Sequence, residues 1–419
     1  SLQRTLRRRQ FAVAWLTYAF YYLGRVNLPV ALPALQAEFG WSPAAVGLIG
    51  TAMYWTYAAG QLVNGHLGDR LSPRRLVALG LLGSAALNLL FGSLGALGGM
   101  VLVWALNGWV QSTGWGPIVK TLSHWFRPEE RGRVTAAFAP CSMAGHALSW
   151  ALAGWLVASA GWRSAFQVPG LLLVGVAAAW YLLARDAPPW APAPGPAASG
   201  APQRGETGAR LRALAGLLSG GGLRWAVVGC LLSGMVKDAL TLWTPTYLAS
   251  HGLAGAVAVL GSLVVPVMGV AGGALAGVLV GGSRARGEAG VVAGLALLAA
   301  AMAGGLWTFG DALPAVRMLC LGGLALACYG INALLMTSLP LALGPGGQVS
   351  GVAGALDLVS YVGGGLSVAL SGGLQARWGW PGVFASWVAL AAALALLAWG
   401  RAAGGASRRV APMADPSGE

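Results

Sequence analysis

The sequence contains few charged side chains. Only 9% of its residues are Asp, Glu, Lys or Arg, whereas ordinary soluble domains carry about 25%. So few charges do not cover a water-facing surface, and this excludes a soluble protein. Apolar segments long enough to cross about 30 Å of hydrocarbon recur along almost the whole chain, and 57% of the residues are hydrophobic. The sequence therefore predicts a polytopic helical membrane protein.

Lysine, cysteine and enzyme motifs are also scarce. The two lysines, Lys120 and Lys237, both fall in or at the end of apolar segments, and arginine supplies all other positive charge. The four cysteines lie in apolar segments and have neither metal-ligand nor disulfide spacing. We find no Gly-rich phosphate loop after a strand, no ligand cluster and no nucleophile elbow. We therefore expect a protein that is not an enzyme and that needs no metal or cofactor.

The net charge of +14 would suit a nucleic-acid partner, but its distribution indicates membrane topology instead. All but six of the 26 Lys and Arg residues lie at the N-terminus, in the loops after even-numbered spans, and at the C-terminus. This is the positive-inside pattern, which predicts both termini in the cytoplasm, with the chain in the inner (plasma) membrane and no nucleic acid bound. The six exceptions are Arg25, Lys120, Arg163, Lys237, Arg317 and Arg377.

The hydrophobic pattern predicts an all-α membrane protein with twelve transmembrane helices in two pseudo-symmetric six-helix bundles. Residues 1–184 would form the N-terminal bundle and 223–401 the C-terminal bundle, joined by a Pro-rich cytoplasmic linker, 185–222, and followed by a disordered tail, 402–419. The expected spans are 10–36, 43–68, 74–95, 98–124, 132–158, 163–184, 223–249, 255–281, 289–310, 313–340, 348–375 and 379–401.

Two cations occupy matching places in the two halves. Arg25 precedes Pro33 by eight residues, and Lys237 precedes Pro245 by eight. A second pair of landmarks, Gly-Trp at the start of the sixth and twelfth spans, repeats at a similar offset, which indicates parallel internal repeats. A charge near the bilayer centre costs about 2.5–3.5 kcal/mol and is seldom kept without a use. We expect both cations to converge on a central cavity and bind an anion.

Two acids, Asp238 and Asp357, also fall within predicted spans. Asp238 follows Lys237 directly, so it points about 100° away around a helix, towards a neighbour. Asp357 shares a helix face with Ser360 and Tyr361, and three roles are open for it: an ion pair with Lys237 that the substrate breaks, a protonatable site, or a structural pair. On the tenth span, Tyr329 and Asn332 share a face and are candidates to line the cavity.

The loop after the second span places an acid at a helix end before clustered arginines: Gly65-His66-Leu67-Gly68-Asp69-Arg70-Leu71-Ser72-Pro73-Arg74-Arg75. It resembles the loop signature of the major facilitator superfamily. This resemblance implies an interhelical charge network that holds one closed state on the cytoplasmic side. The expected gating residues are Asp69, Arg70, Arg74 and, after the fourth span, Arg131.

The fourth span contains a more specific motif. It reads Asn107-Gly108-Trp109-Val110-Gln111-Ser112-Thr113-Gly114-Trp115-Gly116-Pro117, followed by His124-Trp125-Phe126 and Glu130-Arg131-Gly132. This resembles the organophosphate:phosphate antiporter family, over essentially residues 10–400. Further matching segments are Trp243-Thr244-Pro245-Thr246-Tyr247-Leu248, Cys328-Tyr329-Gly330 and Tyr361-Val362-Gly363-Gly364.

The resemblance implies a set of site residues. The family's phosphate-binding arginine corresponds to Arg25, its aromatic partners to Tyr22 and Tyr18, and a second-half cation to Lys237. The chain departs from the family at Gly116, where the family usually has proline, and at two site positions: a lysine of the second helix falls on Gln61, and a histidine of the fifth falls on Ser142. His146, one turn further on, is a candidate substitute for that histidine.

The implied function is exchange of an organophosphate, such as a sugar phosphate or a glycerol phosphate, for inorganic phosphate by alternating access. The partners would be a small anionic substrate and the lipid bilayer, and the carrier would work as a monomer. Two alternatives remain open: a proton-coupled carrier of another organic anion that uses Asp357, and a transporter-like sensor of sugar phosphates.

Overall fold

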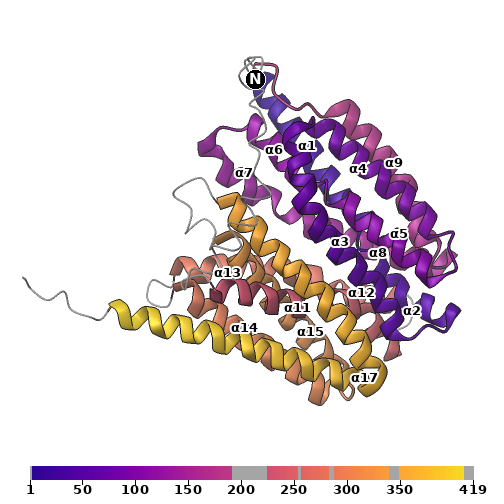
Figure 1. The fold of residues 1–419 in the computed structure, drawn as a ribbon, viewed down its shortest axis with the longest axis vertical. Coiled ribbons are helices and arrows are strands. Elements are labelled where there is room, and N and C mark those ends of the chain that lie inside the picture. Colours follow the sequence, from indigo (N-terminus) through magenta and orange to yellow (C-terminus); the bar gives the residue numbers. More distant parts are fainter. Residues whose placement is uncertain (1, 191–223, 253–255, 283–286, 339–348, 410–419) are drawn as a thin grey trace, which may run out of the picture.

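The computed structural model describes residues 2–190, 224–252, 256–282, 287–338 and 349–409. Every regular element within these residues is a helix, as the sequence predicts. Figure 1 shows the helices in two bundles that lie side by side, the N-terminal one in indigo to magenta and the C-terminal one in orange to yellow.

The N-terminal bundle contains long helices separated by short breaks. Several begin at a proline, which is tolerated in the first turn because the N–H groups there have no partner within the helix. Its elements are α1 Leu2–Tyr21, η1 Tyr22–Gly24, α2 Leu28–Phe39, α3 Pro43–Arg70, α4 Pro73–Phe91, α5 Leu97–Gln111, α6 Trp115–Trp125, η2 Pro128–Glu130, α7 Arg131–Phe138, α8 Pro140–Ala160 and α9 Ser164–Leu183.

The C-terminal bundle follows after the Pro-rich segment. Its elements are α11 Arg224–Ser250, α12 Ala256–Ser262, α13 Val264–Gly282, α14 Gly287–Phe309, α15 Pro314–Ala333, η3 Leu334–Ser338 and α17 Val349–Arg409. Gly379 interrupts α17 with a φ of 66° and a ψ of −166°, a conformation that glycine adopts readily because it lacks a Cβ. This bend falls between the two last predicted spans.

The described part of the chain has eight helices long and apolar enough to cross a membrane, and one of these, Gly354–Ala403, extends over 50 residues. The count of twelve crossings stays a prediction. Residues 402–409 continue α17 as helix, whereas the sequence predicted that a disordered tail begins there. The stretch is rich in alanine and arginine, which favour helix once a preceding helix supplies the nucleus.

The two bundles pack against each other along α3 and α17. Thr51 Oγ1 donates a hydrogen bond to the carbonyl of Gly365 over 2.8 Å, and Trp55 Nε1 donates to the carbonyl of Val362 over 3.2 Å. Gly365 and Gly372 allow this approach, because a Cβ at either would collide with α3. The contact brings the first part of α17, which carries Tyr361, within hydrogen-bonding distance of Arg25, the residue after η1.

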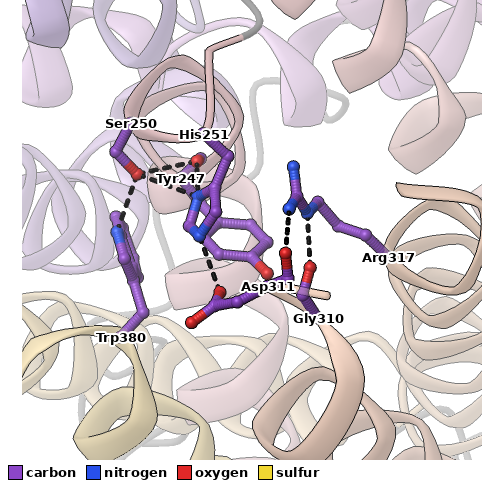
Figure 2. A network of polar contacts seen from close by, with 7 residues as sticks. All are labelled: Tyr247, Ser250, His251, Gly310, Asp311, Arg317 and Trp380. Carbon is purple, nitrogen blue, oxygen red and sulfur yellow. Dashed lines mark hydrogen bonds and ion pairs between the residues drawn. The ribbon is translucent and has the colours of Figure 1, made fainter. Parts of the chain in front are cut away.

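A polar network ties together one end of the C-terminal bundle. Figure 2 shows His251, just after α11, with Nε2 2.6 Å from Asp311 Oδ1 and Nδ1 2.8 Å from the carbonyl of Tyr247. Trp380, beside the bend of α17, donates to Ser250 Oγ over 2.9 Å. These contacts join the end of α11, the α14–α15 turn and the bend in α17, so they fix this end of the bundle.

Candidate functional site

The first span is broken at Arg25. Helix α1 ends at Tyr21, a single 3-10 turn covers Tyr22–Gly24, and α2 starts at Leu28. The break lies inside the span predicted over residues 10–36. Pro29 lacks the N–H that would continue the ladder of hydrogen bonds, and it occupies the first turn of α2. In membrane carriers, irregular backbone is tolerated where it lines a site.

Side-chain amides satisfy the backbone groups that the break leaves free. Asn88 Nδ2 and Asn107 Nδ2 donate to the carbonyl of Gly24 over 3.0 and 2.8 Å. Gln111 Nε2 donates to the carbonyl of Tyr21 over 3.2 Å. We call Asn88, Asn107 and Gln111 the amide collar. All three are buried, so they hold the break, and with it Arg25, in one geometry.

Removing one member of the amide collar should misplace Arg25. Asn88→Ala removes one of the two acceptors of the Asn27 amide and one donor to Gly24, which should lower the free energy of unfolding by about 1–3 kcal/mol. The control is Asn64→Ala, which removes a buried asparagine bonded to α5, away from the break. Thermal unfolding should show a loss in both variants, and phosphate affinity should fall only in Asn88→Ala. Equal affinities would mean that the collar does not position Arg25.

The guanidinium of Arg25 lies among tyrosines from both halves. Its Cζ is 3.9 Å from the ring centre of Tyr57 and 5.3 Å from that of Tyr22. Its Nη2 donates to the hydroxyl of Tyr361 over 2.9 Å. Tyr57 belongs to α3 and Tyr361 to α17, so Arg25 meets the opposite half through a tyrosine hydroxyl, which an anion can replace.

Lys237, in the middle of α11, approaches the same tyrosine from the other side of the interface. Its Nζ lies 5.5 Å from the ring centre of Tyr361. It pairs with Asp238, Nζ to Oδ1, over 3.0 Å, and the two side chains are 12% and 7% exposed. Tyr361 therefore contacts both cations, one from each half of the chain.

Asp357 contacts the other half of the molecule. Its carboxylate accepts a hydrogen bond from the side chain of Gln61 on α3, one turn beyond Tyr57, whose ring centre lies 4.8 Å from that of Tyr361. Within the described residues, the acid in ion-pairing distance of Lys237 is Asp238. The hypothesis of a Lys237–Asp357 ion pair is therefore not what the structure shows.

The remaining candidates lie at different distances from the cations. Tyr329 contacts Thr241 on α11, hydroxyl to Oγ1, over 3.1 Å, which places it beside the turn that follows Lys237. Asn332, one turn further along α15, is partly buried and has no hydrogen bond within the described chain. Tyr329 therefore lies near Lys237, whereas no contact within the described chain places Asn332 beside either cation.

On the first-half side, the buried ring of His146 lies 6.1 Å from that of Tyr22 and 4.6 Å from that of Trp150. Ser142 donates to the carbonyl of Ala139 on the turn that precedes α8. His146 therefore approaches the aromatic shell of Arg25, whereas Ser142 is used locally. Tyr18 packs one layer further out, with its ring 5.7 Å from that of Tyr22.

Of the four predicted gating residues, Arg74 is the one whose side chain the structure describes. Its Nε donates to the carbonyl of Tyr181 over 2.5 Å, and its backbone N–H donates to Asp186 over 2.8 Å. Both partners belong to the same half, so Arg74 joins α4 to the end of α9. The side chains of Asp69, Arg70 and Arg131 lie outside the described residues.

Three features of this site were not predicted from the sequence: Tyr57 against Arg25, Asp238 as the partner of Lys237, and the amide collar. The asparagines carried a signal, because buried amides in apolar helices need partners. The described chain holds no cluster of ligands that could bind a metal ion. The arrangement offers two cations and several hydroxyls to one small anion.

Comparisons with known proteins identify the family of the chain. The sequence model of the Major Facilitator Superfamily matches residues 14–366. A probable hexose phosphate transport protein of Chlamydia pneumoniae is 35% identical over 182 residues, which cover 43% of this chain and 40% of the relative. The glycerol-3-phosphate transporter of Bacillus subtilis is 32% identical over 190 residues, covering 44% and 43%. The matches thus span less than half of the curated relatives' length.

Solved structures show the same fold over nearly the whole chain. A bacterial homologue of the human lysosomal transporter Spinster superposes with a TM-score of 0.76 at 16% identity, covering 96% of this chain and 97% of that one. The nucleoside transporter NupG superposes with a TM-score of 0.73 at 14% identity, covering 94% and 98%. From the fold and the match over most of its length, the chain belongs to the Major Facilitator Superfamily of multi-pass membrane transporters.

Proposed function

We propose that the protein is a secondary active transporter that exchanges an organophosphate for inorganic phosphate by alternating access. The observation that carries this proposal is that Arg25 and Lys237, one from each half, both contact Tyr361. Phosphate and its monoesters carry up to two negative charges and several acceptor oxygens, which suits two cations and a ring of hydroxyls. The relatives named as hexose phosphate and glycerol-3-phosphate transporters support the same substrate class.

The site also suggests how binding leads to exchange. Without a substrate, Tyr361 accepts from Arg25, and Asp238 neutralises Lys237. A phosphate between the cations would replace both contacts and draw the two bundles together. The loaded carrier is then the one that reorients, which gives exchange of one anion for another. Neither ATP nor a cofactor enters this cycle.

Topology and assembly follow from the sequence pattern. The arginine-rich termini and loops favour the cytoplasmic side of the inner (plasma) membrane for both ends of the chain. The site is completed by the two halves of one chain, which supports function as a monomer. Binding of nucleic acid is not part of the proposal, because the positive charge is accounted for by topology.

A second candidate function is a sensor of sugar phosphates. Among the relatives, the membrane sensor protein UhpC of Salmonella typhimurium is 31% identical over 185 residues, which cover 44% of this chain and 42% of the relative. A sensor would use the same two cations to bind its ligand without moving it. Turnover therefore separates the two functions.

The test is competition in proteoliposomes loaded with inorganic phosphate. Uptake of external labelled phosphate should be inhibited by glucose 6-phosphate or glycerol 3-phosphate and not by succinate at the same concentration. Efflux of internal phosphate should match the uptake. Binding of a phosphate ester without flux would identify a sensor, and inhibition by succinate alone would favour the proton-coupled carrier of a carboxylate.

A further inference from the structure

Asp238 is the acid in contact with Lys237, one of the two cations of the proposed phosphate site. Its side chain is 7% exposed and lies in the middle of α11. Oδ1 contacts Lys237, whereas Oδ2 is buried and accepts no hydrogen bond within the described part of the chain. An ionised carboxylate in such a place depends on its cation, because few donors replace the water that it has lost.

The backbone of α17 holds this carboxylate in place. Gly364 faces it, and a Cβ at Gly364 would collide with Oδ2. The Asp238 carboxylate therefore occupies a space that exists because residue 364 has no side chain. This space lies beside Lys237 and next to the segment of α17 that carries Tyr361. The carboxylate has little room to follow Lys237 when that ammonium group turns towards a substrate.

The other charged and titratable groups near Asp238 do not replace Lys237 as its counter-ion. Asp357 carries the same sign of charge and already accepts from Gln61. Arg25 acts on Asp238 from the opposite half, and in the proposed cycle the phosphate occupies it. The groups that interact electrostatically with Asp238 are Lys237, Arg25, Tyr54, Cys328, Tyr329 and Asp357.

We propose that Asp238 is a proton-binding site coupled to the substrate site. When phosphate binds Lys237, the Asp238 carboxylate loses its counter-ion. One proton from water then binds at Oδ2 and neutralises the carboxylate, while Lys237 keeps its own proton. When phosphate leaves, Asp238 releases the proton and pairs with Lys237 again. Each bound phosphate thus carries one additional proton, and this inference rests on the proposed phosphate site.

The consequence is a defined dependence on pH. Phosphate-for-phosphate exchange moves no net proton, because a proton accompanies the anion in both directions. Because binding takes up a proton, the apparent affinity for phosphate should weaken by up to about tenfold for each unit rise in pH, beyond the effect of the titration of phosphate itself.

The test counts the protons that the full chain takes up when phosphate binds. Purified protein in detergent and very weak buffer receives labelled phosphate; a pH-sensitive dye reports the protons taken up, and equilibrium dialysis reports the phosphate bound. Asp238→Asn keeps the shape and a hydrogen-bond acceptor for Lys237. Asp357→Asn is the matched control, since it neutralises the other acid near the site. Wild type and both variants bind the same phosphate species, so titration of the substrate cancels in the comparison.

The Asp238→Asn carrier should take up one proton fewer per bound phosphate than wild type, and the KM of its exchange in proteoliposomes should rise less between pH 6 and pH 8. Asp357→Asn should keep the wild-type proton count, whatever its rate. Equal proton counts in wild type and Asp238→Asn would overturn the inference while leaving the phosphate carrier intact. Loss of the extra proton in Asp357→Asn instead would overturn it in favour of Asp357. Absence of exchange in wild type would reject the proposed function itself.

Discussion

Arg25→Lys should reduce phosphate exchange by about 10- to 100-fold although the positive charge is kept. A hydrogen bond to a charged group contributes about 1.5–3 kcal/mol, and lysine loses the planar fork that binds two phosphate oxygens at once. It also loses the stacking of the guanidinium 3.9 Å from the ring centre of Tyr57. The measurement is the initial rate of labelled phosphate exchange in proteoliposomes at saturating internal phosphate.

The matched control for this variant is Arg163→Lys. Arg163 pairs with Glu38 over 2.7 Å, and both side chains are well exposed, at 44% and 39%. Exposed ion pairs contribute about 0–1 kcal/mol, so exchange should stay within about threefold of wild type. If Arg25→Lys exchanges phosphate as well as Arg163→Lys does, Arg25 serves only as a point charge or does not contact the substrate.

Lys237→Ala should lower phosphate exchange by about 100-fold or more. It removes half of the positive charge of the site and leaves the buried Asp238 carboxylate without its partner. Breaking a buried pair in this way costs about 3–5 kcal/mol, so the single variant is also expected to lose stability. The measurement is exchange at matched amounts of reconstituted protein, together with thermal unfolding in detergent.

Two further variants distinguish loss of the positive charge from loss of stability. Lys237→Ala combined with Asp238→Asn removes the unpaired acid, which should restore stability but not exchange. Lys120→Ala removes the other lysine, at the end of the fourth predicted span, and should leave exchange close to wild type. Recovery of exchange in the double variant would show that Lys237 serves only to neutralise Asp238.

The sequence predicted both cations of the site but not how each is held. Arg25 and Lys237 were found because a charge in an apolar span is conspicuous and because the halves repeat. The helix break at Arg25 was missed, although Gly24 and Pro29 signal it, because hydropathy continues unchanged across it. Helix geometry alone does not reveal the partners that stabilise such a break.

The acids show a second limit of reasoning from spacing. An angle of about 100° between neighbouring residues predicts that Lys237 and Asp238 point apart, but the four-carbon stem of lysine allows its ammonium group to fold back onto the carboxylate. Asp357 shares a face with Tyr361, as predicted, yet its partner comes from α3. Which long side chain meets which acid depends on the packing of distant helices.

The loop residues show the same dependence on distant packing. Arg74 was predicted to join a closing network, and the structure pairs it with Asp186 and Tyr181, more than 100 residues away in the sequence. The motif that marks the loop contains no information about where α9 ends. Local patterns therefore located the charged loop but did not identify its partners.

The most direct test of the two-cation phosphate site is exchange of labelled phosphate in phosphate-loaded proteoliposomes of wild type, Arg25→Ala and Lys237→Ala. The account predicts rapid exchange by wild type and its loss in both variants at equal protein content. Exchange that persists when either cation is removed, or a well-folded wild type that moves no phosphate, would contradict it.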